Sequence, residues 1–120
     1  MAEEKRFENR IKKFLKEESC WSLKYWAGGG FTKSGVPDLL ICCNGFFLGV
    51  EVKAEKGRPS PLQIRELKRI RAAGGIGILL YPEDFEDFRA LIGYIRHCQT
   101  KPLLALVKMF ERKVDEYELI

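Results

Sequence analysis

Asp38, Glu51 and Lys53 are the residues of this chain whose types and spacing point most directly to chemistry. We expect them to lie together at one end of a β-hairpin, with the two acids directly opposite each other. Directly opposite residues have Cβ atoms roughly 4.5–5.5 Å apart. Two carboxylates about 5 Å apart repel by on the order of 3 kcal/mol at an effective dielectric constant of about 20. Folded proteins usually keep such a pair to bind a hard cation or to share a proton.

The hairpin follows from the sequence between the acids. Two apolar, strand-like runs are separated by Asn44-Gly45, the strongest short-range signal for a two-residue turn of type I′. The residues that flank such a turn pair with each other, and counting back from it places Asp38 opposite Glu51. Lys53 then shares the face of Glu51, because side chains in a strand alternate with period two. The two runs are residues 39–43 and 46–50.

Metal-dependent hydrolysis is the chemistry that this set suits best. Asp38 and Glu51 provide the oxygen ligands that Mg²⁺ and Mn²⁺ prefer. Phosphodiester hydrolysis needs an activated water, stabilisation of charge on the phosphate and help for the leaving oxygen, which divalent cations provide. The ammonium of Lys53 can orient the water or neutralise charge at the phosphate. The alternative is that Lys53 forms a surface ion pair with one of the acids, and that the opposite position of the two acids in the hairpin has no functional meaning.

The composition is that of an ordinary globular chain, with 120 residues, 46% of them hydrophobic and 32% charged. This length suits one domain with a single core. No apolar run is long enough to span a membrane and no signal-peptide pattern is visible, so we expect a cytoplasmic protein. The four cysteines have no C-x-x-C spacing, which argues against structural zinc. Cys42 and Cys43 are expected to be small core residues.

The positive charge is concentrated in the part of the chain that holds the motif. Residues 1–75 carry 15 Lys and Arg against 9 Asp and Glu, whereas residues 76–120 carry 6 against 8. This asymmetry favours a polyanionic partner such as DNA near the acids. A scattered, solvated surface would give a similar count, so the charge alone leaves both possibilities open.

Apolar spacing and breaker residues predict the element order α-β-β-β-α-β-α-α. The first helix is expected over residues 4–18, and a short aromatic strand over residues 20–27. After the hairpin, Ser60 and Pro61 begin a helix that ends near residue 73, because both are favoured at helix starts. A strand at 77–81 and two helices, after Pro82 and Pro102, complete an α/β fold with a mixed β-sheet flanked by helices.

The sequences Gly35-Val36-Pro37-Asp38 and Glu51-Val52-Lys53 resemble the PD-(D/E)xK nuclease superfamily, and most closely its small VRR-NUC (virus-type replication-repair nuclease) branch. Four further features agree: the hairpin register, a first helix that carries Glu8, a helix that opens with Ser60-Pro61-Leu62-Gln63, and a strand at 76–81. The resemblance covers about residues 4–95 and implies a restriction-endonuclease-like core. A last helix at about 103–118 lies outside it, and the whole chain of residues 1–120 is expected to form one nuclease domain.

The resemblance also implies roles for particular residues. Asp38, Glu51 and the backbone carbonyl of Val52 would hold Mg²⁺ or Mn²⁺, and Glu8 would complete the acidic cluster around a second metal ion or its water shell. Gln63 would join the active site. The residues themselves leave alternatives open, because Glu8 could be an ordinary exposed glutamate and Gln63 could close a capping box with Ser60.

Candidate DNA contacts lie in the loops beside the hairpin. Lys33, Lys56 and Arg58 are candidates for contacts with backbone phosphates, which position a duplex without reading its sequence. The basic residues of the helix that follows, namely Arg65, Lys68, Arg69 and Arg71, fit DNA binding and a solvated helix face equally well. Trp21, Trp26 and Phe31 could stack on bases, but we expect them in the core, where aromatic residues are commoner.

These observations predict a metal-dependent DNA endonuclease. Stand-alone members of the resembled family cut branched DNA such as four-way (Holliday) junctions as dimers, so the resemblance implies a structure-selective homodimer in DNA repair or in a phage. The alternatives are a restriction-type, flap or nicking nuclease, and a non-catalytic DNA-binding module on the same fold. The apolar stripe of the last helix would serve either as a dimer contact or as a cover for the sheet.

Overall fold

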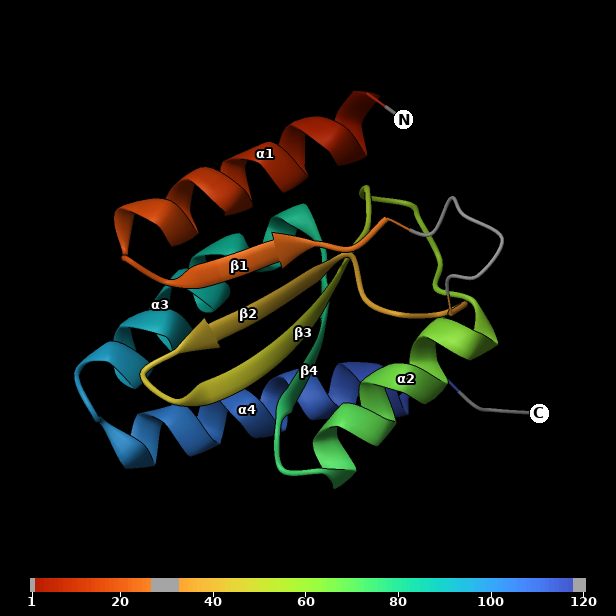
Figure 1. Cartoon of the computed structure of the whole chain (residues 1–120). Coiled ribbons are helices and arrows are strands. Elements are labelled where there is room, and N and C mark those ends of the chain that lie inside the picture. Colours follow the sequence, from red (N-terminus) through yellow and green to blue (C-terminus); the bar gives the residue numbers. More distant parts are fainter. Residues whose placement is uncertain (1, 27–32, 118–120) are drawn as a thin grey trace.

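The computed structural model describes residues 2–26 and 33–117 (Figure 1). The predicted order of helices and strands is confirmed, with a short 3₁₀ helix, η1, added before the third helix. The elements are α1 (Ala2–Glu17), β1 (Trp21–Lys24), β2 (Leu39–Cys43), β3 (Phe46–Val52), α2 (Pro61–Ala72), β4 (Ile76–Leu80), η1 (Pro82–Asp84), α3 (Phe85–Arg96) and α4 (Thr100–Asp115). None of the helices in these two ranges is both long and apolar enough to cross a bilayer.

The four strands form one mixed sheet in the order β1-β2-β3-β4. The predicted hairpin register is confirmed, since Cys43 pairs with Phe46 and Leu39 pairs with Val50. The turn residues Asn44 and Gly45 have φ angles of 48° and 85°, as a type I′ turn requires. β4 runs parallel to β3, as expected of a strand that returns through a helix.

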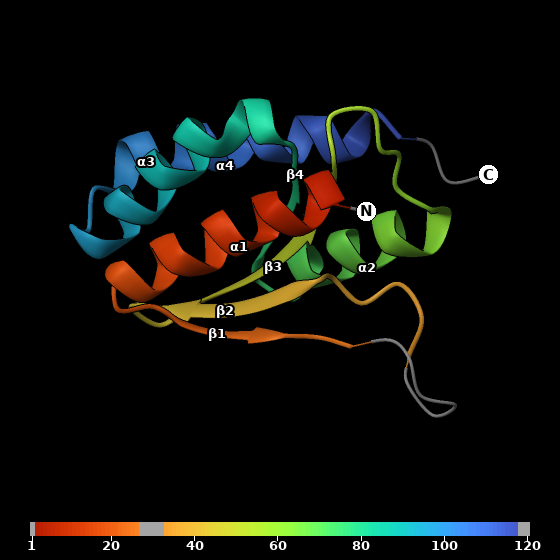
Figure 2. The ribbon, with the colours of Figure 1, turned by 90° about the horizontal axis from the view of Figure 1, so that it is seen from above.

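Helices cover the two faces of the sheet unequally. The face built from residues such as Ile41, Leu48 and Ile78 packs against α1 and α3 in the main core. On the other face α2 packs against β4, where Ile64 and Leu67 contact Leu79. Figures 1 and 2 show that α1, α3 and α4 lie behind the sheet while the front of β1 and β2 has no helix over it.

Two local differences from the sequence predictions concern β1 and the cysteines. Trp21 and Trp26 are 59% and 68% exposed, so the expectation that they belong to the core was wrong. For Trp21 the reason is that β1 is an edge strand whose outer face has no covering layer, whereas Trp26 follows the end of that strand. Cys42 points to the same outer face and is exposed, while Cys43 is buried as expected. Phe31 lies outside the described residues.

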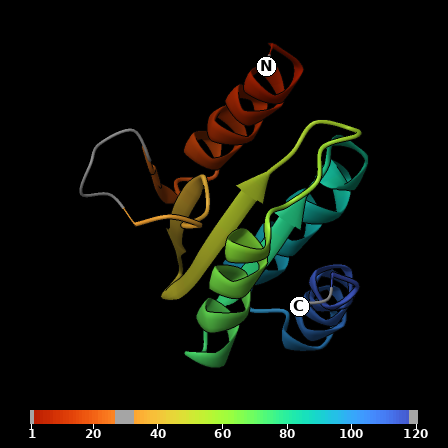
Figure 3. The same cartoon turned by 90° about the vertical axis from the view of Figure 1, so that its right-hand side faces the viewer.

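The last helix begins at Thr100, earlier than its predicted start after Pro102. Proline is tolerated there because the N–H groups of a first helical turn have no partner within the helix. Its buried residues Leu103, Phe110 and Val114 pack against the rest of the chain, which favours the sheet-covering role that the sequence left open. Figure 3 shows α4 beside β4, on the side away from β1.

Gly35 lets the segment before Asp38 pass closely under the start of α2. Its φ angle is +84°, and a Cβ atom there would lie 2.6 Å from the carbonyl oxygen of Leu62. We expect Gly35→Ala to lower the free energy of unfolding by about 1–3 kcal/mol, because both the strain and the clash would have to be relieved. Urea unfolding measures this change. Gly93→Ala is the matched control, since nothing lies within 4 Å of its added methyl group, and equal effects of the two variants would contradict the prediction.

Candidate active site

Asp38 and Glu51 lie where the hairpin strands meet the loops. The pairing of β2 with β3 ends at Leu39 and Val50, so Asp38 stands one position beyond the last pair. Its Oδ2 atom accepts a hydrogen bond of 2.8 Å from the N–H group of Val52. The two acids are therefore neighbours, as the hairpin register predicted, and Asp38 is fixed against the backbone next to Glu51.

Glu51 is the most unusual group of the site, because it is only 2% exposed. Its Oε2 atom accepts a 2.9 Å hydrogen bond from Nε2 of Gln63 and lies 3.4 Å from Nζ of Lys53. Its Oε1 atom is buried and has no hydrogen-bond partner among the described residues. Burial, and then the charge of Asp38, raises the pKa of Glu51 from 4.5 to about 8, although Lys53 acts in the opposite direction.

Gln63 closes the capping box that the sequence suggested and also contacts Glu51. Its Oε1 atom accepts a 2.8 Å hydrogen bond from the N–H group of Ser60, while its own N–H group donates to the Ser60 hydroxyl at 3.2 Å. This closes the capping box at the start of α2. The remaining amide nitrogen is then free to hold Glu51. The cap thus fixes the orientation of a side chain that reaches the acids.

Glu8 lies on the buried face of α1 and is 3% exposed, so it is not the ordinary surface glutamate of the alternative interpretation. Its Oε1 atom lies 2.7 Å from Nζ of Lys24, and its Oε2 atom lies 3.7 Å and 3.6 Å from the ammonium groups of Lys5 and Lys12. Burial raises the pKa of Glu8, but the hydrogen bond and charge of Lys24, with the charges of Lys12 and Lys5, lower it overall. Glu8 is therefore held ionised.

Lys24 is a site residue that the sequence did not predict. Its ammonium contacts both Glu8 Oε1 at 2.7 Å and Asp38 Oδ1 at 3.3 Å, and so links α1 to the hairpin. Burial lowers the pKa of Lys24, but the neighbouring carboxylates of Glu8 and Asp38 raise it overall. Period-two alternation does turn Lys24 away from the face of Leu23. However, no tight turn joins β1 to β2, so its distance from the acids was not predictable.

We expect Lys24→Met to lower the free energy of unfolding in EDTA by about 1–3 kcal/mol, because a buried carboxylate loses its closest partner. Lys5 and Lys12 remain within 4 Å of Glu8 and limit the loss. Chemical denaturation measures the effect. The double variant Glu8→Gln, Lys24→Met should recover most of the lost stability, since it no longer leaves a buried glutamate carboxylate without its closest partner. Additive losses in the double variant would contradict a direct Glu8–Lys24 pair.

The donor set fits a hard divalent cation that keeps some of its water. Asp38 and Glu51 offer carboxylate oxygens, and the unpartnered Oε1 of Glu51 is a buried acceptor that a cation would satisfy. No three Asp, Glu, His or Cys side chains converge on one ion-sized position within residues 2–26 and 33–117. Mg²⁺ is commonly held by only one or two carboxylates with several waters, so the two acids suffice. Glu8 is paired with Lys24 and does not converge with Asp38 and Glu51 on one ion-sized position.

Among the described residues, no hydrogen bond or ion pair joins the predicted DNA contacts Lys33, Lys56 and Arg58 to Asp38 or Glu51. Lys33 is half exposed and lies 3.1 Å from Oε1 of Glu66 on α2, so a phosphate would compete with that carboxylate. Lys56 and Arg58 are exposed on the loop that follows β3. Of the four basic residues on α2, Arg65 and Arg69 also lie within 3.4 Å of Glu66 and Arg71 pairs with Asp115.

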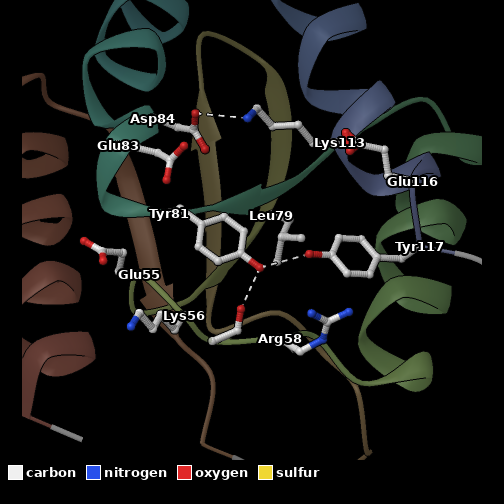
Figure 4. A pocket seen from close by; sticks show the side chains of 11 residues that line it. Glu55, Lys56, Arg58, Leu79, Tyr81, Glu83, Asp84, Lys113, Glu116 and Tyr117 are labelled. Carbon is white, nitrogen blue, oxygen red and sulfur yellow. Dashed lines mark hydrogen bonds and ion pairs between the residues drawn. The ribbon is translucent and has the colours of Figure 1, made fainter.

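The loop that carries Lys56 and Arg58 is held by a tyrosine pair (Figure 4). The hydroxyl of Tyr81 donates a 2.8 Å hydrogen bond to the carbonyl of Gly57 and lies 3.3 Å from the hydroxyl of Tyr117. A cavity of about 410 Å³ opens beside this pair. The tyrosines thus fix the backbone of the loop while its basic side chains reach solvent.

Comparison with known proteins identifies the family. No curated protein matches the sequence. The family model of the archaeal Holliday junction resolvase (Hjc) matches residues 2–73, which is more than half of the chain and includes every predicted side chain of the acidic site. This match agrees with the mixed sheet flanked by helices. The chain therefore belongs to the archaeal Holliday junction resolvase (Hjc) family, whose members are structure-selective, metal-dependent endonucleases of the PD-(D/E)xK type that hydrolyse DNA phosphodiester bonds.

Proposed function

We propose that the acidic cluster around Asp38 and Glu51 is the catalytic centre of this nuclease. The observation that carries the proposal is Glu51, a buried carboxylate that faces Lys53 and Gln63 and lies next to Asp38. Oε1 of Glu51 is a buried acceptor without a partner among the described residues, a feature that it shares with Oε2 of Glu8 and Oδ2 of Asp84, but at Glu51 the neighbouring Asp38 offers a second oxygen ligand for a cation. A metal site explains why this costly arrangement is kept.

Asp38, Glu51 and the carbonyl of Val52 would hold the divalent cation. Within a strand, the N–H and C=O groups of one residue point to the same neighbouring strand. The N–H group of Val52 points to Asp38, which supports a carbonyl that faces the same side. Bound there, a divalent cation would supply an activated water and charge stabilisation at the phosphate. Mg²⁺ and Mn²⁺ both suit an all-oxygen set, and the cluster does not distinguish them.

The side chains around the cation have separate tasks. Lys53 orients the attacking water or neutralises charge on the scissile phosphate, because its ammonium lies beside Glu51 and is not fully buried. Gln63 fixes the rotamer of Glu51 from the capped start of α2. Glu8 acts through Lys24 or through the water shell, since the ammonium lies between it and Asp38. The loop residues Lys56 and Arg58, and Lys33 once released from Glu66, bind DNA phosphates.

The finer placement in the VRR-NUC branch remains a prediction from the two motif segments, Gly35–Asp38 and Glu51–Lys53. The match to the Hjc family concerns the same superfamily and does not test that branch. The domain boundaries are likewise a proposal: α4 belongs to the same nuclease domain, because its buried residues join both the main core and the α2 cluster.

A second copy of the chain would cover the bare face of the sheet. Trp21 on β1 and Phe47 on β3 both pair with Cys42 on β2, so the three side chains lie in one row on this face. Leu23 lies on the same face. Trp21, Phe47 and Leu23 are 59%, 44% and 50% exposed. An isologous contact through this apolar face would place two identical sites in a fixed relation. A four-way junction must be cut on two strands, which is the reason to favour a second copy over another partner.

Light scattering tests the homodimer. We expect a particle of twice the 13.9 kDa chain at micromolar concentration, and dissociation in the double variant Trp21→Ser, Phe47→Ser, because it makes the proposed interface polar. Leu104→Ser is the control, since Leu104 on α4 is 54% exposed but lies on another surface. A monomeric wild-type protein, or equal dissociation in the control, would rule out this interface.

Cleavage of labelled DNA tests the catalytic proposal. A four-way junction is compared with linear duplex, flap and single-stranded DNA in Mg²⁺ or Mn²⁺, with EDTA as the metal-free control. We expect paired, symmetric cuts in the junction that disappear in EDTA. Cuts in flaps or linear duplex instead would favour a different nuclease specificity, and binding without any cleavage would favour a non-catalytic module.

A further inference from the structure

Trp26 is 68% exposed and stands beside the acidic cluster. The ammonium of Lys24 lies 5.4 Å from the centroid of its ring, and the same ammonium contacts Glu8 and Asp38 at 2.7 Å and 3.3 Å. A single exposed aromatic residue is ordinary on a protein surface. The exposed indole of Trp26 therefore lies next to an ammonium that contacts two acids of the candidate nuclease site.

The backbone next to Trp26 is anchored to the site. The N–H group of Tyr25 donates a 2.8 Å hydrogen bond to the carbonyl of Asp38. The hydroxyl of Tyr25 accepts a 2.9 Å hydrogen bond from the N–H group of Lys33 and donates to the carbonyl of the same residue at 3.3 Å. The position of Trp26 is therefore tied to the segment that carries Asp38.

Trp26 also lies apart from the bare apolar face that we assign to the dimer. A second ammonium, that of Lys5 on α1, lies 5.4 Å from the centroid of its ring. The indole is thus on the α1 side of β1, whereas Trp21 and Leu23 point away from α1 with the other outer residues. A contact that buries the outer face does not need to bury Trp26.

The surroundings of Trp26 match the chemistry of an unpaired or unstacked base. Aromatic side chains stack on any base and do so without sequence preference. The ammonium of Lys5, whose side chain is about half exposed, suits a phosphate next to such a base. For an indole to enter between the stacked base pairs of an intact duplex, the pairs must first be unstacked, which costs free energy. At a branch point the stacking is already interrupted. An exposed indole at this position would therefore favour branched over linear DNA.

We propose that Trp26 stacks on a base at the branch point of the DNA and is a determinant of the preference for branched substrates. The inference rests on the proposed active site, because it is the acids that place the scissile phosphate within reach of the indole. Trp26 has no part in the chemical step and acts only on which DNA is bound.

Binding measured in EDTA tests the role of Trp26 without cleavage. Affinities for a four-way junction and for a linear duplex of the same sequences are compared among the wild type, Trp26→Ala, Trp26→Phe and the control Leu104→Ala. We expect Trp26→Ala to weaken junction binding about tenfold and duplex binding less than about twofold, because one stacking contact is lost. Trp26→Phe should bind nearly as the wild type does, and light scattering should show the same oligomeric state for all four proteins.

Fluorescence gives a second readout. In Trp21→Phe the indole of Trp26 is the single tryptophan that remains of two, and its emission should be quenched by the junction but not by the duplex. A junction preference that survives in Trp26→Ala, or that falls equally in Leu104→Ala, would overturn this inference but leave the proposed active site standing. A changed oligomeric state in Trp26→Ala would assign the residue to an interface instead. A wild-type protein that binds both DNAs equally would overturn the inference and the proposed substrate together.

Discussion

Lys53→Met is expected to lower the rate of junction cleavage by about 10²–10³-fold while leaving junction affinity within about twofold. Methionine keeps most of the apolar stem but removes the ammonium that lies 3.4 Å from Glu51 Oε2. The lost interaction is one with the developing charge or the attacking water, so it affects the transition state more than the bound substrate. Single-turnover cleavage in Mg²⁺ or Mn²⁺, together with binding in EDTA, separates these two effects.

The pH profile of the residual activity gives an independent check on the same variant. The charge of Lys53 opposes the burial that raises the pKa of Glu51. Removing that charge should raise the pKa further and move the rise of activity to higher pH. Lys108→Met is the control, because Lys108 is an exposed lysine on α4 and its loss changes the net charge equally. If the cleavage rate of Lys53→Met falls less than tenfold, or falls only as much as the affinity for the junction, Lys53 is a phosphate contact and has no part in the chemical step.

The hairpin was predictable from sequence because a two-residue turn leaves no freedom in the register. Once Asn44 and Gly45 are recognised, every pair from Cys43 with Phe46 to Leu39 with Val50 follows. The position of Asp38 next to Glu51 follows in turn. The bond from Val52 N–H to Asp38 was not predictable, because it depends on how the chain leaves the strand and not on the register itself.

Contacts between elements that no tight turn connects could not be predicted from the sequence. Lys24 reaches Glu8 and Asp38 through the packing of α1 and the long connection from β1 to β2, neither of which has a local signature. Trp21 and Trp26 were wrongly expected in the core, since composition does not reveal that Trp21 lies on the uncovered face of an edge strand or that Trp26 lies just beyond its end. The capping box of Gln63 was visible in the sequence, but its simultaneous bond to Glu51 needed the three-dimensional position of α2.

Glu51→Gln is expected to stabilise the metal-free protein at alkaline pH while abolishing cleavage. The pKa of Glu51 is about 8 in the folded protein against an ordinary 4.5, so the folded state binds its proton more tightly than the unfolded state. Below pH 4.5 both states are protonated and the residue carries no penalty. As the pH rises toward 8, the stability of the wild type falls by on the order of 2–4 kcal/mol, because the unfolded state ionises first. Glutamine does not ionise and avoids that loss.

Urea unfolding in EDTA at pH 5 and pH 8.5 measures this effect. The advantage of Glu51→Gln over the wild type should grow between the two values by about 1–3 kcal/mol, less than the full shift because the site relaxes. Glu17→Gln, at an exposed position of α1, should show no such growth. Adding Mg²⁺ or Mn²⁺ at pH 8.5 should stabilise the wild type but not Glu51→Gln, since only an ionised carboxylate binds the cation. Parallel pH curves for the two proteins would show that Glu51 is not held protonated. That result would contradict the idea that the protein keeps a destabilising buried carboxylate in order to bind a cation.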